Sequence, residues 1–311
     1  MIRPPALRPG SRVALVAAAG PLPPGGVERA MDRVRAFGWE PVAGRFCRER
    51  CSGYLAGTDD ERAADLEAAL TDPGLDAIWF LRGGYGTMRI LDRIDWPALA
   101  THPKALIGFS DNTAVHLAAQ RAGVVSFHGP HPHTAEFPDF ARDTFLPVLT
   151  EARPAGVLPF PAGSAGCAEA LVEGRVEGPL LGGNLSLVAS TLGTPFAIQP
   201  RGAILFLEEV GEHVYRLDRL LSHLKLAGVL NAVAGIAIGA FSEVPDEGSE
   251  GRPTVRELLQ DRLGDLGIPV AFGFPFGHVE DNWTLPLGVR ARLDAGAGTL
   301  ELLEPAVAER G

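Results

Sequence analysis

Strand-like and helix-like segments alternate through the first half of the chain. Short runs with the composition of strands lie at 12–18, 40–42, 77–81, 105–109 and 124–127. Between them, apolar residues recur at helical spacing in segments at 27–37, 59–70, 87–94 and 112–121. Apolar spacing near 3.6 residues is typical of helices that bury one face. Strand and helix in this order predict a mostly parallel sheet with helices on both faces.

The second half of the chain has a different residue composition. Pro, Gly and Ala crowd the region from 138 to 178, which is typical of a connector. We therefore divide the chain into a first domain at 1–140, a connector at 141–177 and a second domain at 178–311. In the second domain a strong helix at 215–226 is surrounded by short β-like runs at 202–207, 233–241, 270–272 and 289–293. This predicts a second, smaller α/β domain.

Composition narrows the class of protein. The chain has 311 residues, 46% of them hydrophobic and 21% charged, as expected for a soluble globular protein of two domains. Its formal net charge of −10 argues against nucleic acid or an anionic membrane as the main partner, because both attract clustered Lys and Arg. No stretch approaches the roughly 18 apolar residues of a membrane span. A small molecule or a peptide fits better as the substrate.

Two features bear on the cellular compartment. The segment at 1–21 imitates a secretory signal, but Pro9 and Gly10 precede a short apolar run that a first buried strand explains equally well. The cysteines Cys47, Cys51 and Cys167 are too few and too irregular for a disulfide framework, and they complete no zinc pattern. We expect reduced thiols in a cytosolic protein.

A serine stands where the strand at 105–109 should end. In GFSDN (108–112), Ser110 follows a glycine by two positions and a helix begins at once. This matches a nucleophile elbow, in which a tight turn projects the hydroxyl and the next backbone N–H faces the developing oxyanion. The usual second glycine is replaced by Asn112. The alternative is that Ser110 caps the following helix.

A glycine cluster, RGGYG (82–86), follows another buried strand. Such a cluster at the carboxyl edge of a sheet allows close approach between backbone and ligand. A dinucleotide fingerprint would need a third glycine, and Arg89 stands in its place.

Two further segments carry an acid and a base. Glu208 ends the apolar strand of LFLEEVGE (205–212), where a carboxylate can orient a histidine; the alternative is a solvated acidic turn. His278 lies in FGFPFGHVEDNWTLPLG (272–288), a loop rich in glycine, proline and aromatic residues, and it is either a functional or a packed structural histidine.

Other histidines are considered as metal ligands. His128, His131 and His133 in HGPHPHT are separated by prolines and lack the helical spacing of a zinc site, so we predict no metal. His131 and His133 receive no role from the sequence. His116 lies on the helix after Ser110 and is interpreted as a packing residue.

Taken together, the motifs resemble the LD-carboxypeptidase family of serine peptidases, which includes the muramoyltetrapeptide carboxypeptidases. The motifs RGGYG, GFSDNT, HGP, LLGGNL, LFLEEVGEHVYRLDR, FGFPFGH and TLPLG stand in the family's order and cover about 12 to 300. The first strand departs from the family's common Ala-Pro-Ser-Gly ending, because here it reads Ala18-Ala19-Gly20-Pro21. This departure leaves substrate choice more open than catalysis.

The resemblance implies a fold and a mechanism. The fold would be a Rossmann-like domain carrying Ser110 and a swivelling β/α domain, with the active site in the cleft between them. Ser110 would be the nucleophile, Glu208 rather than Glu209 the triad acid and His278 the general base. The backbone N–H groups of Asp111 and of a glycine of the 83–84 pair, taken as Gly84, would form the oxyanion hole.

The resemblance also implies a substrate and a setting. Relatives are usually cytoplasmic homodimers that cleave the terminal D-alanine from murein tetrapeptides during cell-wall recycling. Acyl transfer by a serine, a histidine and an acid requires no metal or organic cofactor. Predicted substrate contacts are Arg82, Tyr85 and Asn184, with Arg82 as the first candidate to bind the free carboxylate, unless it is a structural ion-pair partner.

Two other functions remain open at this point. Microcin immunity peptidases of the same family cleave an amide that joins an aminoacyl or peptidyl group to a nucleotide analogue, and Trp283 is the nearby aromatic residue that could hold a base. A non-catalytic two-domain ligand-binding protein is the second alternative. The preferred diamino acid, the accepted muropeptide length and the dimer geometry are not predicted.

Overall fold

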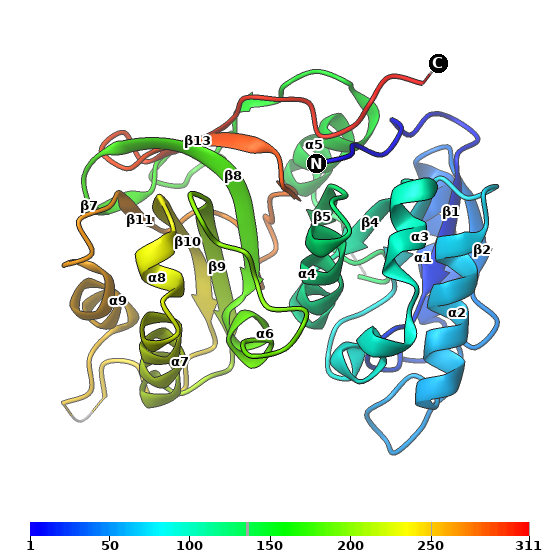
Figure 1. The fold of residues 1–311 in the computed structure, drawn as a ribbon, viewed down its shortest axis with the longest axis horizontal. Coiled ribbons are helices and arrows are strands. Elements are labelled where there is room, and N and C mark those ends of the chain that lie inside the picture. Colours follow the sequence, from blue (N-terminus) through cyan, green and yellow to red (C-terminus); the bar gives the residue numbers. More distant parts are fainter. Residues whose placement is uncertain (135–136, 250, 311) are drawn as a thin grey trace. The chain divides into compact units, whose positions relative to one another are not determined.

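The structure is a computed structural model that describes residues 1–134, 137–249 and 251–310. Contacts divide the chain into two compact units. The first comprises Met1–Arg153, Thr284–Gly288 and Pro305–Gly311, and the second comprises Pro154–Trp283 and Val289–Glu304. Each unit is built on its own sheet (Figure 1).

The first unit contains a parallel sheet with one antiparallel edge. Over the described residues its strand order is β12-β5-β4-β3-β1-β2, and only β12 is antiparallel to its neighbour. The strands are β1 (Arg12–Val16), β2 (Glu40–Ala43), β3 (Ala77–Phe80), β4 (Ala105–Gly108), β5 (Ser126–His128) and β12 (Leu285–Leu287). The apolar run that imitated a secretory signal contains the last four residues of β1, which are buried. The chain adds β2 on one side of β1 and then adds β3, β4 and β5 in order on the other side. The carboxyl ends of the parallel strands β1 and β3 therefore form the switch point at which open α/β sheets bind ligands.

Helices cover both faces of this sheet. They are α1 (Gly26–Ala36), α2 (Asp59–Thr71), η1 (Thr87–Arg93), α3 (Trp96–Thr101), η2 (Ser110–Asn112), α4 (Thr113–Arg121) and α5 (Asp139–Thr150), where η marks 3-10 helices. Right-handed crossovers place α1 on the face opposite to α2, α3 and α4, which lie together in front of the sheet in Figure 1. On the α1 face, Trp79 of β3 stacks on Phe145 of α5, with ring centroids 4.9 Å apart.

The second unit holds a mixed sheet. Over the described residues the order is β6-β14-β13-β8-β9-β10-β11-β7, with β8 to β11 parallel to one another. The strands are β6 (Gly156–Val157), β7 (Glu169–Val172), β8 (Arg175–Asn184), β9 (Ile204–Val210), β10 (Gly235–Ser242), β11 (Val270–Phe272), β13 (Arg290–Asp294) and β14 (Thr299–Leu302). The helices are α6 (Leu185–Ser190), α7 (Val214–Leu226), α8 (Val229–Ala232) and α9 (Val255–Leu263).

The element order confirms the predicted α/β class, whereas the boundaries differ from the predicted ones. The region at 141–177 contains most of α5 together with β6 and β7, and the two units divide it at Arg153 and Pro154. The segment Thr284–Gly288 belongs to the first unit because β12 pairs with β5. Pairing of β12 with β5 joins residues about 160 positions apart, which local patterning does not reveal.

Strand β8 was not predicted because its sequence, RVEGPLLGGN, is rich in residues that strands usually avoid. The structure gives the reason for the glycines. A Cβ on Gly182 would lie 1.8 Å from the carbonyl oxygen of Phe206 in β9, and one on Gly178 would lie 2.4 Å from that of Gly202. Glycine therefore lets the β9 segment approach β8 closely. Among the described residues, no helix combines the length and apolar character needed to cross a bilayer.

Candidate active site

Ser110 is held in a strained backbone conformation in the first unit. It follows β4 and the extended residue Phe109, and its φ is 61°. Among the described residues, only Ser52 and Glu243 share a positive φ without being glycine. A left-handed conformation costs a non-glycine residue roughly 1–2 kcal/mol, and such strain persists where surrounding contacts fix it. Neither η2 nor α4 has a side-chain cap, so the structure contradicts the capping alternative for Ser110.

Residues around Gly108 explain how the turn is held. A Cβ on Gly108 would lie 2.8 Å from Oδ1 of Asn112 and 3.2 Å from Cβ of Phe80, so a larger residue would displace them. The Nε2 of His116 donates a hydrogen bond to the Gly108 carbonyl over 2.7 Å. Burial lowers the pKa of His116 to about 4, so the ring is neutral at neutral pH and its proton lies on Nε2. His116 therefore packs beneath the turn.

The glycine cluster at 82–86 forms a loop after β3, called the glycine loop below, and this loop lies directly against Ser110 within the first unit. A Cβ on Gly83 would lie 2.9 Å from Oγ of Ser110 and 3.3 Å from the backbone N of Asp111. The carbonyl of Gly83 accepts a hydrogen bond from the N–H of Gly20, which follows β1. Gly84, the predicted oxyanion-hole residue, has a φ of 102°. The backbone of the 83–84 pair is thus close to Ser110, and Gly83 is the glycine of the pair whose added Cβ would contact the serine side chain.

The other predicted contacts in this unit are exposed. Nη1 of Arg82 donates to the carbonyl of Pro21 over 2.7 Å, in the segment that joins β1 to α1. Tyr85 is 51% exposed, and its ring lies 5.8 Å from that of Tyr54, which sequence reasoning did not select. These side chains are therefore accessible to a ligand near the glycine loop.

The second unit brings Glu208 and His278 together. Glu208 is fully buried near the carboxyl end of β9, and its Oε2 lies 2.7 Å from Nδ1 of His278. The His278 side chain is 21% exposed. The approach depends on Gly277, whose φ is 111° and whose Cβ would lie 2.7 Å from Cβ of Glu208. The N–H of Gly277 also donates to Oδ1 of Asn282 over 3.0 Å, which fixes the loop.

Glu209 has a different, structural set of partners. It is buried and accepts hydrogen bonds from Nδ2 of Asn184 and from the backbone N–H groups of Ser186 and Val210, at 2.8, 2.8 and 2.9 Å. Burial raises the pKa of Glu209 despite these donors. Asn184, a predicted substrate contact, is 2% exposed, and its Oδ1 accepts from the Leu187 N–H to cap α6. Its amide therefore supports the framework of the second unit, and direct contact with substrate stays a prediction.

The histidines of HGPHPHT pack around the residue that precedes Ser110. The ring of Phe109 lies 5.7 Å from that of His128 and 4.6 Å from that of His131, and both histidines are buried. Nδ1 of His131 lies 3.0 Å from the carbonyl oxygen of Phe80. Burial lowers the pKa of His133. Within the described part of the chain, no group of three or more His, Cys, Asp or Glu residues could hold a metal ion.

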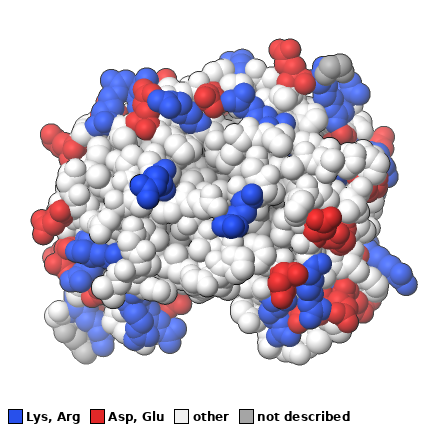
Figure 2. Space-filling view, in the orientation of Figure 1, with Lys and Arg blue, Asp and Glu red and all other residues white. Residues whose placement is uncertain are grey.

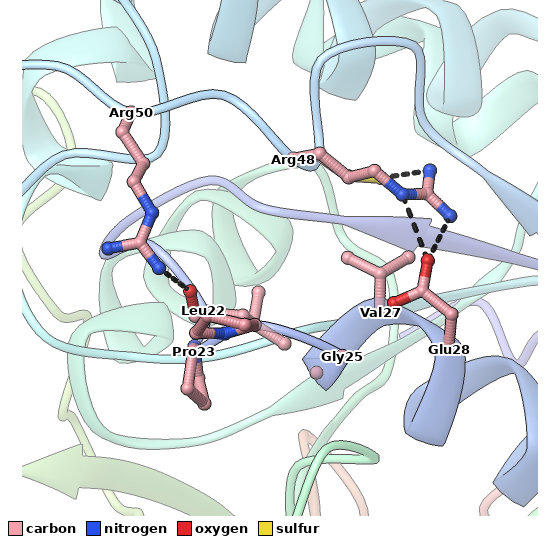
Figure 3. A pocket seen from close by; sticks show the side chains of 10 residues that line it. Leu22, Pro23, Gly25, Val27, Glu28, Arg48 and Arg50 are labelled. Atoms are coloured by element: carbon pink, nitrogen blue, oxygen red, sulfur yellow. Dashed lines mark hydrogen bonds and ion pairs between the residues drawn. The ribbon is translucent and has the colours of Figure 1, made fainter.

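A pocket of about 210 Å³ lies at the start of α1 (Figure 3). Its lining includes Arg48 and Arg50. Arg48 forms an ion pair with Glu28 of α1 over 2.8 Å, and Arg50 donates to the carbonyl of Leu22. Both guanidinium groups are therefore already engaged by the protein. On the face shown in Figure 2, acidic and basic side chains are interspersed, and no large area of one sign is visible.

Sequence reasoning missed two side-chain contacts in the first unit. Arg62 on α2 is 1% exposed, and its Nη1 donates to the carbonyls of Ala18 and Gly86 over 2.6 and 2.7 Å. The Asp111 carboxylate accepts from the Thr87 N–H over 2.8 Å. An arginine within a helix and an acid after a serine carry no sequence signal that distinguishes such contacts from a solvated surface.

An α/β framework with a strained serine and a histidine paired with a buried glutamate has the residue types of a serine hydrolase. Family models agree with this class: the LD-carboxypeptidase N-terminal domain matches residues 13–129, and the LD-carboxypeptidase C-terminal domain matches residues 177–293. The chain belongs to the LD-carboxypeptidase family and is a serine-type peptidase. The predicted family resemblance is therefore confirmed, and the non-catalytic alternative is wrong.

Individual relatives extend along nearly the whole chain. A Streptomyces coelicolor protein, whose name gives it only as a candidate carboxypeptidase, is 44% identical over an alignment of 317 positions that covers 100% of this chain and 99% of that protein. The murein tetrapeptide carboxypeptidase of Pseudomonas aeruginosa is 32% identical over an alignment of 292 positions that covers 91% of this chain and 93% of that protein.

Solved structures share the fold. The crystal structure of a muramoyltetrapeptide carboxypeptidase from Oxalobacter formigenes has 31% identity and a TM-score of 0.83, covering 94% of this chain and 98% of that one. A microcin C7 self-immunity protein in complex with aspartyl sulfamoyl adenosine has a TM-score of 0.88 and covers 99% of this chain and 100% of that one. Its identity is 24%, so it supports the fold alone.

Proposed function

We propose that this peptidase hydrolyses the amide bond that releases the terminal D-alanine of murein tetrapeptides, with Ser110, His278 and Glu208 as a catalytic triad. The observation that carries the proposal is the 2.7 Å contact between Oε2 of the buried Glu208 and Nδ1 of His278. With Nδ1 engaged by the carboxylate, proton exchange with a hydroxyl would use Nε2. A buried carboxylate in this position also stabilises the imidazolium that forms during the reaction.

The strained backbone of Ser110 supports its role as the nucleophile. A sharp turn after a buried strand is the arrangement that projects a serine hydroxyl from the edge of a sheet. The backbone N of Asp111 and the 83–84 glycine backbone lie beside this serine, where N–H groups can stabilise an oxyanion. Gly84 remains the proposed second donor, with Gly83 as the neighbouring possibility.

The proposed reaction follows a two-step acyl transfer. His278 takes the hydroxyl proton as Oγ of Ser110 attacks the carbonyl carbon of the amide. The tetrahedral intermediate collapses, the C–N bond breaks, and the same proton passes from His278 to the departing amine of D-alanine. Water then attacks the acyl-enzyme, gives one proton to His278 and releases the shortened peptide, while Ser110 recovers its proton. The steps need no metal or organic cofactor.

An exopeptidase must also recognise a free carboxylate. Arg82 is exposed at the start of the glycine loop and is the proposed partner, because a guanidinium binds carboxylates with paired hydrogen bonds. Tyr85 is the proposed neighbouring contact. We further propose a cytoplasmic homodimer, which molecular-mass measurement in solution and fractionation of cells can test.

Mass spectrometry tests the function directly. Purified protein is incubated with L-Ala-γ-D-Glu-meso-diaminopimelate-D-Ala, and loss of one D-alanine is followed beside Ser110→Ala and a chelator control. We expect release that survives the chelator and falls by about 10⁴-fold or more in the Ser110→Ala variant. Release that persists in folded Ser110→Ala would exclude Ser110 as the nucleophile.

The aminoacyl-nucleotide alternative receives less support from the site. Trp283, the aromatic residue considered for holding a base, is fully buried, and its Nε1 donates to the carbonyl of Pro159 over 2.6 Å. Its ring packs against Phe160, Phe274 and Phe276. Turnover of an aminoacyl sulfamoyl nucleotide faster than the murein tetrapeptide would nevertheless reverse the preference.

A further inference from the structure

The proposed reaction uses the backbone N–H of Asp111 but gives its carboxylate no role. Asp111 is 3% exposed, and its Oδ2 accepts a hydrogen bond from the backbone N–H of Thr87 over 2.8 Å. Thr87 is the first residue after the glycine loop at 82–86. One buried side chain therefore joins the nucleophile turn to the loop that lies against it.

The peptide group between Gly86 and Thr87 is held at both of its polar ends. Its N–H donates to Asp111, and its carbonyl accepts from Nη1 of Arg62 over 2.7 Å. A Cβ on Gly86 would lie 2.9 Å from that Nη1, so glycine is needed for the close approach. Two buried side chains thus fix the orientation of the peptide that ends the loop.

The side chains of Asp111 and Arg62 also interact electrostatically. Burial raises the pKa of Asp111, and the nearby Arg62 guanidinium together with the Thr87 N–H opposes that effect. Burial lowers the pKa of Arg62, and the negative charges of Asp59 and Asp111 oppose that effect. Burying two opposite charges at this place is costly unless both are hydrogen-bonded, as they are here.

We propose that the Asp111 carboxylate is a positioning residue that sets the distance between the two oxyanion-hole segments, by holding Thr87 and the end of the glycine loop against the nucleophile turn. This inference rests on the proposed function, because the oxyanion hole matters only if Ser110 is acylated. Its physical part, the restraint on the loop, can be measured without a substrate.

The expected effect is on the transition state rather than on substrate binding. Losing one oxyanion-hole donor costs about 10²–10³-fold in kcat, and a displaced donor retains part of its effect. Asp111→Ala is therefore expected to lower kcat by roughly 10–100-fold with little change in KM. Asp111→Asn keeps an oxygen that can accept from Thr87, so it should recover most of the lost kcat.

Asp65 provides a matched control in the same unit. It is 8% exposed, its Oδ2 accepts from the Phe46 N–H over 2.9 Å, and burial raises its pKa as it does for Asp111. Asp65→Ala and Asp65→Asn remove the same kind of buried carboxylate at a place that does not adjoin Ser110. They should lower stability without lowering kcat, measured well below each variant's melting temperature.

The experiment combines kinetics with amide hydrogen exchange over 82–90. Faster exchange in Asp111→Ala than in wild type or Asp65→Ala, together with the kcat loss and its recovery in Asp111→Asn, is the expected result. Unchanged exchange in folded Asp111→Ala would overturn the positioning role. A kcat no lower than that of Asp65→Ala would overturn its catalytic consequence. If wild-type protein released no D-alanine, the proposed function would fail, while hydrogen exchange would still decide the restraint.

Discussion

Replacing Glu208 with glutamine is the sharpest test of the Glu208–His278 pair. The substitution keeps the shape of the side chain but removes its charge and gives it an amide that can donate to Nδ1 of His278. If the amide donates, the proton of the neutral ring must lie on Nε2, where it prevents the ring from accepting the hydroxyl proton. If the amide oxygen accepts instead, the tautomer is correct but the imidazolium loses its counter-charge.

The size of the effect follows from the contact. Oε2 and Nδ1 are 2.7 Å apart, and Glu208 is fully buried. With the two charge centres about 4 Å apart and an effective dielectric constant of about 20, the attraction is about 4 kcal/mol. Because about 1.4 kcal/mol corresponds to a tenfold change in rate, Glu208→Gln should lower kcat by about 10³-fold.

The assay is release of D-alanine from the murein tetrapeptide under saturating substrate, with folding checked by circular dichroism. Glu209→Gln is the matched control, because this neighbouring buried carboxylate bonds to Asn184, Ser186 and Val210 rather than to His278. We expect Glu209→Gln to lower stability and to change kcat far less than Glu208→Gln. A loss of less than about tenfold in kcat for Glu208→Gln would refute the electrostatic reasoning. The carboxylate charge would then stabilise the transition state by less than about 1.4 kcal/mol.

Three further outcomes are expected. Arg82→Ala should mainly raise KM for the tetrapeptide, as measured by steady-state kinetics, and an unchanged KM would remove its role in carboxylate recognition. Gly277→Ala should lower kcat while the protein stays folded, because its Cβ would lie 2.8 Å from Oε2 of Glu208 and push the His278 loop away; wild-type kcat would contradict this. His116 takes up its proton near pH 6.5 when unfolded and near 4 when folded, so wild-type stability should fall as pH drops between these values. Urea unfolding of His116→Gln should show a shallower fall, and an identical slope would refute the assignment.

Much of the first unit was predictable because its signals are local. The predicted strand at 105–109 and helix at 112–121 are close to β4 and α4, and Ser110 was placed correctly between them. The segment at 87–94 was predicted as helical and forms a 3-10 helix, η1. The short helix α3 was missed, because six residues with a proline at their start carry little periodicity.

The chemistry was predictable only in part. Glu208 was preferred over Glu209 through the family resemblance, and the structure supplies a physical difference, since Glu208 contacts His278 while Glu209 is bound by framework amides. Trp283 was considered for a binding role and is buried in an aromatic cluster, because sequence gives residue type without exposure.

The sequence by itself determined the alternation of strands and helices, the position of Ser110 at a strand end and the family to which the chain belongs. Those features depend on spacing and residue type over a few neighbouring positions. Only the tertiary structure decided that Gly83 lies against Ser110, that Gly277 makes room for Glu208, and that the Asp111 carboxylate reaches Thr87. Such contacts join segments 24 to 69 positions apart, and they depend on close packing of the folded backbone, which no local pattern encodes.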